Sequence, residues 1–392
     1  MKGVDISYCY TDIKADKESV ELSADNCYLP ANEIMKRLIH EHNGKFRVTY
    51  SISGTALELF QKHRPDVIHS FKQLVKTGCV EIMAETYYHS LSFLHSKKEF
   101  RRQVAQHSIL INELFGIQPA VFRNTELIYN NQLAQQVADL GFKGILCEGA
   151  ERILQGRSPN HLYTAPGRKD AMLLLRNARL SDDIAFRFDD TNWNDFPLTA
   201  GKFAEWLHAH PKETEVINLL MDYETLGIHK KTGSGIFGFL EAFPAAVLTS
   251  DNFKFSVPSG VLNEYTAKDV YDSPGAISRE DRSNASCVWS ENRQQNNTLK
   301  KIYSIENMVL ASGSEKAMDT WGRLQAADYF YYMSGESCKA AAYKYHNPFS
   351  TADEAFQNYS NIVADFEIAL IEKEIAGRKK IFQRASFINA IL

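Results

Sequence analysis

Short apolar segments alternate with amphipathic stretches along the chain down to about residue 260. Parallel strands are buried on both faces and need a helix to return the chain, so this alternation predicts βα units around a parallel sheet. The strands predicted in this way are Phe46–Ser53, Val80–Ala84, Ala120–Phe122, Gly144–Cys147, Met172–Leu175, Val216–Met221 and Phe253–Val257.

The clearest predicted helix between these strands is Glu99–Phe115. Its apolar residues Phe100, Val104 and Ile111 recur at helical spacing, so they share one face that can pack on a sheet. Gly116 follows directly, as is typical of a helix C-cap.

The pattern changes after the last predicted strand. Residues 262–298 are rich in Ser, Asn, Asp and Arg and predict a long polar connection. Helical periodicity then dominates over Leu299–Ala311, Glu315–Met333 and Ala352–Phe387. We therefore expect an α/β fold, a βα barrel or sheet over residues 1–262, followed by a helical domain over residues 263–392.

Acidic residues stand where three of the predicted strands end. In parallel βα folds the chemistry lies at the carboxyl ends of the strands. A single acid at the end of a strand ordinarily caps the next helix. Acids at the ends of three strands favour a catalytic role instead. The residues concerned are Glu85 with His89, Arg123 with Glu126, and Asp222 with Glu224.

Paired carboxylates from different strands are what glycoside hydrolysis requires, one as nucleophile or base and the other as general acid. Glu126 and Asp222 are far enough apart in the chain to come from different strands. Arg123 would keep Glu126 ionised if it lies beside it, although an ordinary salt bridge explains the same pair equally well.

Composition excludes several other functions. The formal charge is −4, with 44 Lys and Arg against 48 Asp and Glu, so no basic surface predicts nucleic acid or an anionic membrane as partner. No apolar run approaches the ~20 residues of a membrane span, and no signal peptide is visible, so a cytoplasmic protein is expected. The six cysteines form no CxxC pair, and HExxH, GxSxG and phosphate-loop motifs are absent. We expect no metal and no cofactor.

The segments FRNTELIY and NLLMDYETLG resemble the paired catalytic motifs of glycoside hydrolase family 57, the α-amylase and 4-α-glucanotransferase family. The similarity continues through NCYLPANEIM, FRVTYSISGTALE, GCVEIMAETYYHS, LSDDIAFRF and AADYFYYMSG, in the same order. The resemblance implies an incomplete (β/α)7 barrel followed by a helical domain. It also implies retaining chemistry on α-1,4-glucans or malto-oligosaccharides, as hydrolysis or glucan transfer, without a metal.

The resemblance also implies roles for individual residues. Glu126 would be the nucleophile and Asp222 the acid/base, with Glu224 positioning Asp222. The residues expected to bind substrate, by sugar hydroxyl contacts or by stacking, are Glu81, His89, Arg123, Trp193, Tyr223, Glu224 and Asp328.

The chain departs from the family pattern in several places. The His-Gln-Pro tripeptide of the first motif is missing, so the first barrel strand is expected to be missing too. Arg279 stands where relatives tend to carry tryptophan, and Ala327 and Tyr329 replace what looks like a Ser and a His. A catalytically inactive oligosaccharide-binding relative is therefore the main alternative. A metal-dependent deacetylase-like barrel is a weaker one, because the histidines are scattered.

Overall fold

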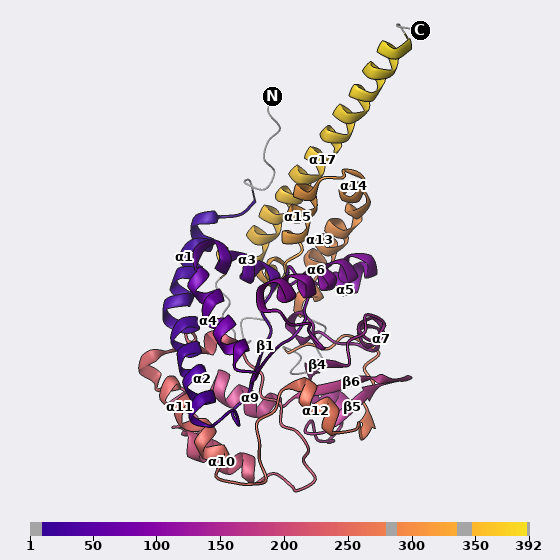
Figure 1. The fold of residues 1–392 in the computed structure, drawn as a ribbon. Coiled ribbons are helices and arrows are strands. Elements are labelled where there is room, and N and C mark those ends of the chain that lie inside the picture. Colours follow the sequence, from indigo (N-terminus) through magenta and orange to yellow (C-terminus); the bar gives the residue numbers. More distant parts are fainter. Residues whose placement is uncertain (1–9, 280–287, 335–346, 390–392) are drawn as a thin grey trace. The chain divides into compact units, whose positions relative to one another are not determined.

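The computed structural model describes residues 10–279, 288–334 and 347–389 (Figure 1). The chain divides into two compact units. Residues 14–87 and 98–287 form one, called the sheet unit here, and residues 1–13, 88–97 and 288–392 form the other, called the helical unit. The described residues 263–279, which lie in the predicted helical domain, group with the sheet unit.

Parallel strands form the centre of the sheet unit. Strand β1 (Val48–Tyr50) pairs with β2 (Val80–Ile82), and β3 (Val121–Arg123) pairs with β4 (Gly144–Glu148), which pairs with β6 (Arg168–Arg176). A parallel bridge from Ala84 to Phe122 links the two groups, and another from Arg176 to Asn218 adds one more segment. The parallel order thus follows the chain order, so the strand ends meet at one edge.

Several strands of the structure differ from those that the sequence predicts. Strand β5 (Leu162–Ala165) was missed; it pairs antiparallel with β6 and parallel with β9 (Asp269–Val270). The predicted strand Phe253–Val257 is wrong, because no ladder forms there, and Val216–Met221 makes only the bridge at Asn218. Short strands β7 (Leu226–Gly227) and β8 (Lys230–Lys231) pair with each other.

Helices surround these strands in the sheet unit, and the predicted helix Glu99–Phe115 is confirmed within α6. Several begin with a side-chain cap, such as Ser53 accepting from the Ala56 N–H at 3.2 Å. The helices are α1 (Ile13–Ser23), the π-helix η2 (Ala24–Tyr28), α2 (Leu29–Glu41), α3 (Gly54–His63), α4 (Pro65–Lys76), α6 (Lys97–Phe115), α7 (Asn131–Asp139), α8 (Glu151–Leu154), α9 (Ala178–Ala185), α10 (Ala200–His208), α11 (Ile236–Val247) and α12 (Pro258–Glu264).

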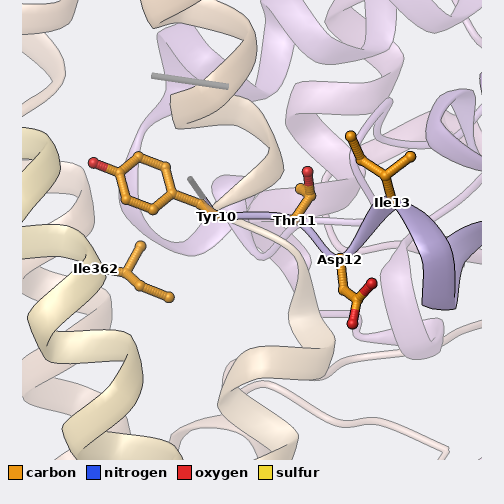
Figure 2. A pocket seen from close by; sticks show the side chains of 5 residues that line it. All are labelled: Tyr10, Thr11, Asp12, Ile13 and Ile362. Atoms are coloured by element: carbon orange, nitrogen blue, oxygen red, sulfur yellow. The ribbon is translucent and has the colours of Figure 1, made fainter. Parts of the chain in front are cut away.

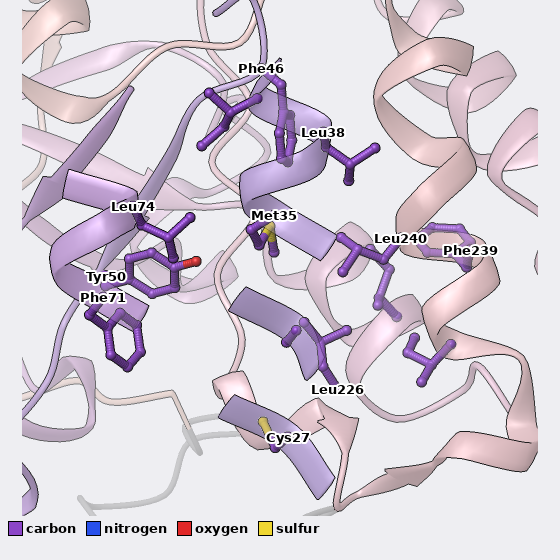
Figure 3. Packing of buried hydrophobic residues seen from close by; sticks show 14 of the residues in the cluster. Cys27, Met35, Leu38, Phe46, Tyr50, Phe71, Leu74, Leu226, Phe239 and Leu240 are labelled. Atoms are coloured by element: carbon purple, nitrogen blue, oxygen red, sulfur yellow. The ribbon is translucent and has the colours of Figure 1, made fainter. Parts of the chain in front are cut away.

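A large apolar core lies where α2, α4 and β1 meet α11. Leu38, Phe71 and Leu74 are almost fully buried there, and Figure 3 shows them with Leu240 and other members of the cluster. Burial of such side chains contributes about 1.5–3 kcal/mol each. This core holds β1, β2 and the segment around Leu226 in fixed places, and so fixes the strand ends.

The helical unit consists mainly of helices, as the sequence predicted. The helices are α5 (Ser92–His95), α13 (Arg293–Ser304), α14 (Glu306–Ala311), α15 (Glu315–Arg323), α16 (Ala327–Tyr332) and α17 (Ala352–Asn389). The predicted helices Leu299–Ala311 and Glu315–Met333 are each divided in two, whereas Ala352–Phe387 is confirmed within α17. Trp321 is buried and its Nε1 donates to the Ile302 carbonyl at 2.8 Å, which joins α15 to α13. Among the described residues, we find no helix with the length and apolar character needed to span a bilayer.

Gly227 is required by a close backbone approach. Its φ is +105°, and a Cβ at this position would lie 1.9 Å from the Asn26 carbonyl oxygen of the π-helix. Gly227→Ala should therefore lower the free energy of unfolding by about 2 kcal/mol or more, measured by urea denaturation.

Gly238 offers a matched control, since it lies in α11 and a Cβ there would meet nothing within 4 Å. Gly238→Ala should be neutral or stabilising by up to about 1 kcal/mol. Equal effects of the two substitutions would show that the contact with Asn26 is not tight.

Candidate active site

Glu126 follows β3 in a strained backbone conformation. The one-turn helix η3 (Thr125–Leu127) has φ values of 53° at Glu126 and 54° at Leu127, both in the left-handed region. The Asn124 side chain donates to the Ile128 carbonyl at 2.9 Å and holds this turn closed. Non-glycine residues adopt such φ values where surrounding contacts compensate the strain, and such residues cluster at functional sites. Glu126 itself is 5% exposed.

Asp222 is delivered by a segment that side chains hold against β6. Asn218 Nδ2 donates to the Leu175 carbonyl at 2.9 Å, and the Arg176 Nε donates to the Leu220 carbonyl at 2.9 Å. These bonds replace the ladder that a strand would make, which explains why the predicted strand Val216–Met221 is not regular. Asp222 follows at once and precedes η4 (Tyr223–Thr225).

The guanidinium of Arg279 lies between Glu126 and Asp222. Its Nη2 is 3.3 Å from Glu126 Oε2, and its Nη1 is 2.8 Å from Asp222 Oδ1. Because one guanidinium reaches both, the two contacted oxygens are no more than about 9 Å apart. The side chains of Arg279 and Glu126 are 6% and 7% exposed, and that of Asp222 is 25% exposed. Two acids from distant parts of the chain thus face one buried cation.

Arg123 does not have the partner that the sequence suggested. Its Nη1 lies 3.2 Å from Glu85 Oε2, and Arg279 is the cation beside Glu126. Glu85 is buried and also accepts from Ser51 Oγ at 2.5 Å. The Arg123 pairing with Glu126 was therefore wrong, and Arg123 belongs to a structural ion pair at the ends of β2 and β3.

A second buried ion cluster, which the sequence-based predictions do not include, lies at the ends of β4 and β6. Arg176 Nη1 is 3.3 Å from Glu148 Oε2, and its Nη2 also pairs with Asp182. Burial raises the pKa of Glu148 to about 7, and the positive charges of Arg176 and Arg279 reduce this rise. The signal was present in the sequence, because Glu148 ends an apolar strand as Glu126 and Asp222 do.

Glu224 and Tyr223, which follow Asp222 in the chain, pair with side chains of η2 and α2. Tyr28 Oη donates to Glu224, and Tyr223 Oη donates to Asn32 Oδ1 at 2.7 Å. The Tyr223 ring lies against Tyr28 and edge-on to Tyr50, and burial raises its pKa well above the usual value. This aromatic packing anchors the residues that follow Asp222.

The remaining predicted sugar contacts lie in three separate places. Glu81 Oε2 accepts from the Ser259 N–H at 2.9 Å at the start of α12, and burial raises the pKa of Glu81. Trp193 packs edge-on to Trp206 with Arg187 over its ring. Their predicted roles in binding sugar stay predictions.

His89 and Asp328 lie together in the helical unit. The Ala327 N–H donates to the His89 carbonyl at 2.9 Å, and Asp328 follows in the first turn of α16. His89 also has a left-handed φ of 50°. Their predicted contacts with substrate also stay predictions.

A surface hollow in the helical unit is lined by Tyr10, Thr11, Asp12, Ile13 and Ile362 (Figure 2). Tyr10 Oη donates to Asp365 Oδ2 at 2.5 Å beside it. None of the five lining residues is a predicted site residue, so this hollow adds nothing to the acid cluster.

Comparisons with known proteins agree on one family. Residues 4–274 match the model of glycosyl hydrolase family 57, and the chain therefore belongs to this family. It is 39% identical over 376 residues to a Methanocaldococcus jannaschii protein named "Putative alpha-amylase", covering 93% of this chain and 79% of that one.

Solved structures show the same fold at low identity. The 4-alpha-glucanotransferase of Thermococcus litoralis is similar with a TM-score of 0.68 and 16% identity, over 90% of this chain and 56% of that one. A family 57 branching enzyme of Thermococcus kodakaraensis is similar with a TM-score of 0.64 and 13% identity, over 90% and 86%. These likenesses support a mixed α/β fold with added helices.

The raised pKa of Glu148 predicts a pH-dependent stability. Between its unfolded pKa, near 4.5, and about 7, the folded protein keeps a proton that the unfolded chain has lost. The free energy of unfolding of the wild type should therefore fall as pH rises through this window, by up to roughly 3 kcal/mol. That of Glu148→Gln should not show this fall, because glutamine cannot ionise. Urea denaturation from pH 4.5 to 8 measures the difference.

Glu205→Gln serves as the charge-matched control, because Glu205 is exposed on α10. Its stability curve should run parallel to that of the wild type. If the Glu148→Gln curve does the same, Glu148 is ionised throughout this pH range.

Proposed function

We propose that this protein is a retaining glycoside hydrolase acting on α-1,4-glucans, with Glu126 as nucleophile and Asp222 as acid/base. The observation that carries the proposal is the pair of acids, from two separate strand ends, facing the same buried guanidinium. Their limited separation is compatible with carboxyls that flank one scissile bond, which stand roughly 5–9.5 Å apart across the two mechanistic classes. Membership of family 57 supports the substrate class.

In the first step the Glu126 carboxylate attacks the anomeric carbon of a glucosyl unit. The bond from this carbon to the glycosidic oxygen breaks, and protonated Asp222 gives its proton to the leaving oxygen. In the second step Asp222 takes a proton from water, whose oxygen attacks the same carbon and releases Glu126. A sugar hydroxyl in place of this water would give glucan transfer. Each inversion at the anomeric carbon reverses the other, so the configuration is retained.

The surroundings of the two acids suit this chemistry. Low exposure around Glu126 strengthens electrostatic interactions with the charge that develops on the sugar. The strained turn at residues 125–127, the Asn124 bond and the Arg279 N–H donated to the Glu126 carbonyl at 3.2 Å fix the carboxyl in place. Tyr28 and Glu224 anchor the other side, which gives Glu224 a positioning role toward Asp222.

For the fold, we propose that the parallel series β1, β2, β3, β4, β6 and the Asn218 segment belongs to a (β/α)7 barrel. The chain order of these strands supports it. The helices from residue 288 onward would form the second domain. The cytoplasmic location stays a prediction.

The alternative is an inactive relative that binds oligosaccharide. It is favoured by the same Arg279, whose charge stabilises the ionised form of Asp222 although the first step needs Asp222 protonated. Product formation from a glucan separates the two proposals.

Incubation with maltoheptaose tests the catalytic roles. Glu126→Gln and Asp222→Asn should each lower kcat/KM at least about a thousandfold, because each removes a group that forms or breaks a bond. An aryl maltoside with a good leaving group should rescue Asp222→Asn much more than Glu126→Gln, since that leaving group needs no proton.

Azide provides a control for the assignment. With Glu126→Ala it should attack in place of the nucleophile and give a β-glucosyl azide, whereas with Asp222→Ala it should replace water and give the α product. Products of the opposite configuration would exchange the two roles. Equal substrate survival with wild type and both variants would exclude the enzyme and leave the binding protein.

A further inference from the structure

The guanidinium of Arg279 occupies the space that the proposed reaction needs. Reacting atoms must approach to about 3–3.5 Å, with the nucleophile on one side of the glucosyl ring and the acid/base on the glycosidic oxygen. The guanidinium nitrogens already lie 3.3 Å from Glu126 and 2.8 Å from Asp222. A glucosyl unit and this guanidinium cannot both lie between the two carboxyls.

We propose that Arg279 fills the position of the reacting glucosyl unit in the free protein, and that a glucan binds by displacing this side chain. The inference rests on the proposed function, because it names the place where that reaction would occur. Arg279 is thus a specificity-determining residue, since only a ligand that gains enough contacts elsewhere can replace two buried ion pairs.

Displacement has an electrostatic consequence. Among the described residues, Glu148 on β4 feels the charge of Arg279, and Arg176 on β6 pairs with both Glu148 and Asp182 of α9. When the guanidinium leaves, Glu126 and Asp222 lose the positive charge of Arg279, while Glu148 and Asp182 keep that of Arg176. Carboxyls that lose their counter-ion take up protons more readily. The guanidinium lies closer to Asp222 than to Glu126, at 2.8 Å against 3.3 Å, so its departure removes more stabilisation from the ionised form of Asp222.

Proton uptake at Asp222 is also the change that the first catalytic step requires. Substrate entry and arming of the general acid would then be one event, because the sugar removes the cation that keeps Asp222 ionised. Without substrate, both acids stay paired and the site cannot act as an acid. This coupling resolves the conflict between a resting ion pair and an acid catalyst.

Calorimetric titration with a thio-linked maltotetraose, which resists hydrolysis, tests the proposal without turnover. Arg279→Ala should bind this ligand about tenfold more tightly or better than the wild type, because no ion pair has to be broken. The wild type should also take up protons on binding, measured from titrations in two buffers of different ionisation enthalpy. Arg279→Ala should take up fewer.

Arg157→Ala is the matched control, because Arg157 pairs with Asp269 at 2.6 Å in the same unit but contacts neither acid. It should bind and take up protons as the wild type does. Arg279→Lys keeps a charge and tests the proposal if the alanine variant does not fold. A lysine ammonium cannot span both carboxyls as a guanidinium does, so its affinity should lie between those of wild type and alanine variant.

The possible outcomes separate the two proposals. Equal affinity of wild type and Arg279 variants, or weaker binding by the variants, overturns the displacement while the proposed function stands. Absence of binding by wild type and variants alike, together with no product from maltoheptaose, removes the proposed function and the displacement with it.

Discussion

One buried guanidinium, that of Arg279, is the constraint on which the candidate site depends. It contacts both acids, and its backbone N–H also donates to the Glu126 carbonyl. Bringing two carboxylates together out of water is unfavourable unless a cation compensates them. The same residue thus offsets part of the charge of the pair and helps to hold Glu126 in a left-handed conformation. The arrangement of the strand ends therefore depends on a residue more than fifty positions beyond Asp222 in the chain.

Ion pairs recur around the ends of the parallel strands. Glu85 pairs with Arg123 at β2 and β3, while Arg176 at the end of β6 pairs with Glu148 of β4. Each acid lies where a polar group can face the edge of the sheet, and each has a cation within reach. This alternation of charge allows many ionisable groups to remain buried together, because an unpaired one would be costly. Movement of one cation would therefore change the electrostatic environment of several neighbouring acids.

Many of the strands and both acids of the candidate site were predictable from the sequence. The features that were not predictable have physical reasons. Apolar runs located β1 to β4 well, because burial on both faces leaves a strong local signal. The Val216–Met221 segment failed, since its backbone bonds to side chains such as Asn218 rather than to a ladder. Acid positions at strand ends were visible for Glu126 and Asp222. Their cation was not, because pairing depends on three-dimensional approach, and the nearest arginine in sequence, Arg123, has another partner.

The energetic cost of the site favours a working enzyme over a silent relative. Buried ion pairs add little stability compared with well-packed apolar side chains of similar volume. The left-handed φ of Glu126 costs a further 1–3 kcal/mol or so. A protein that only bound oligosaccharide would need neither cost, since hydroxyl contacts and stacking do not require two acids facing each other. Two acids that face one cation, together with the strained turn, are therefore better explained by chemistry in which the acids change their charge.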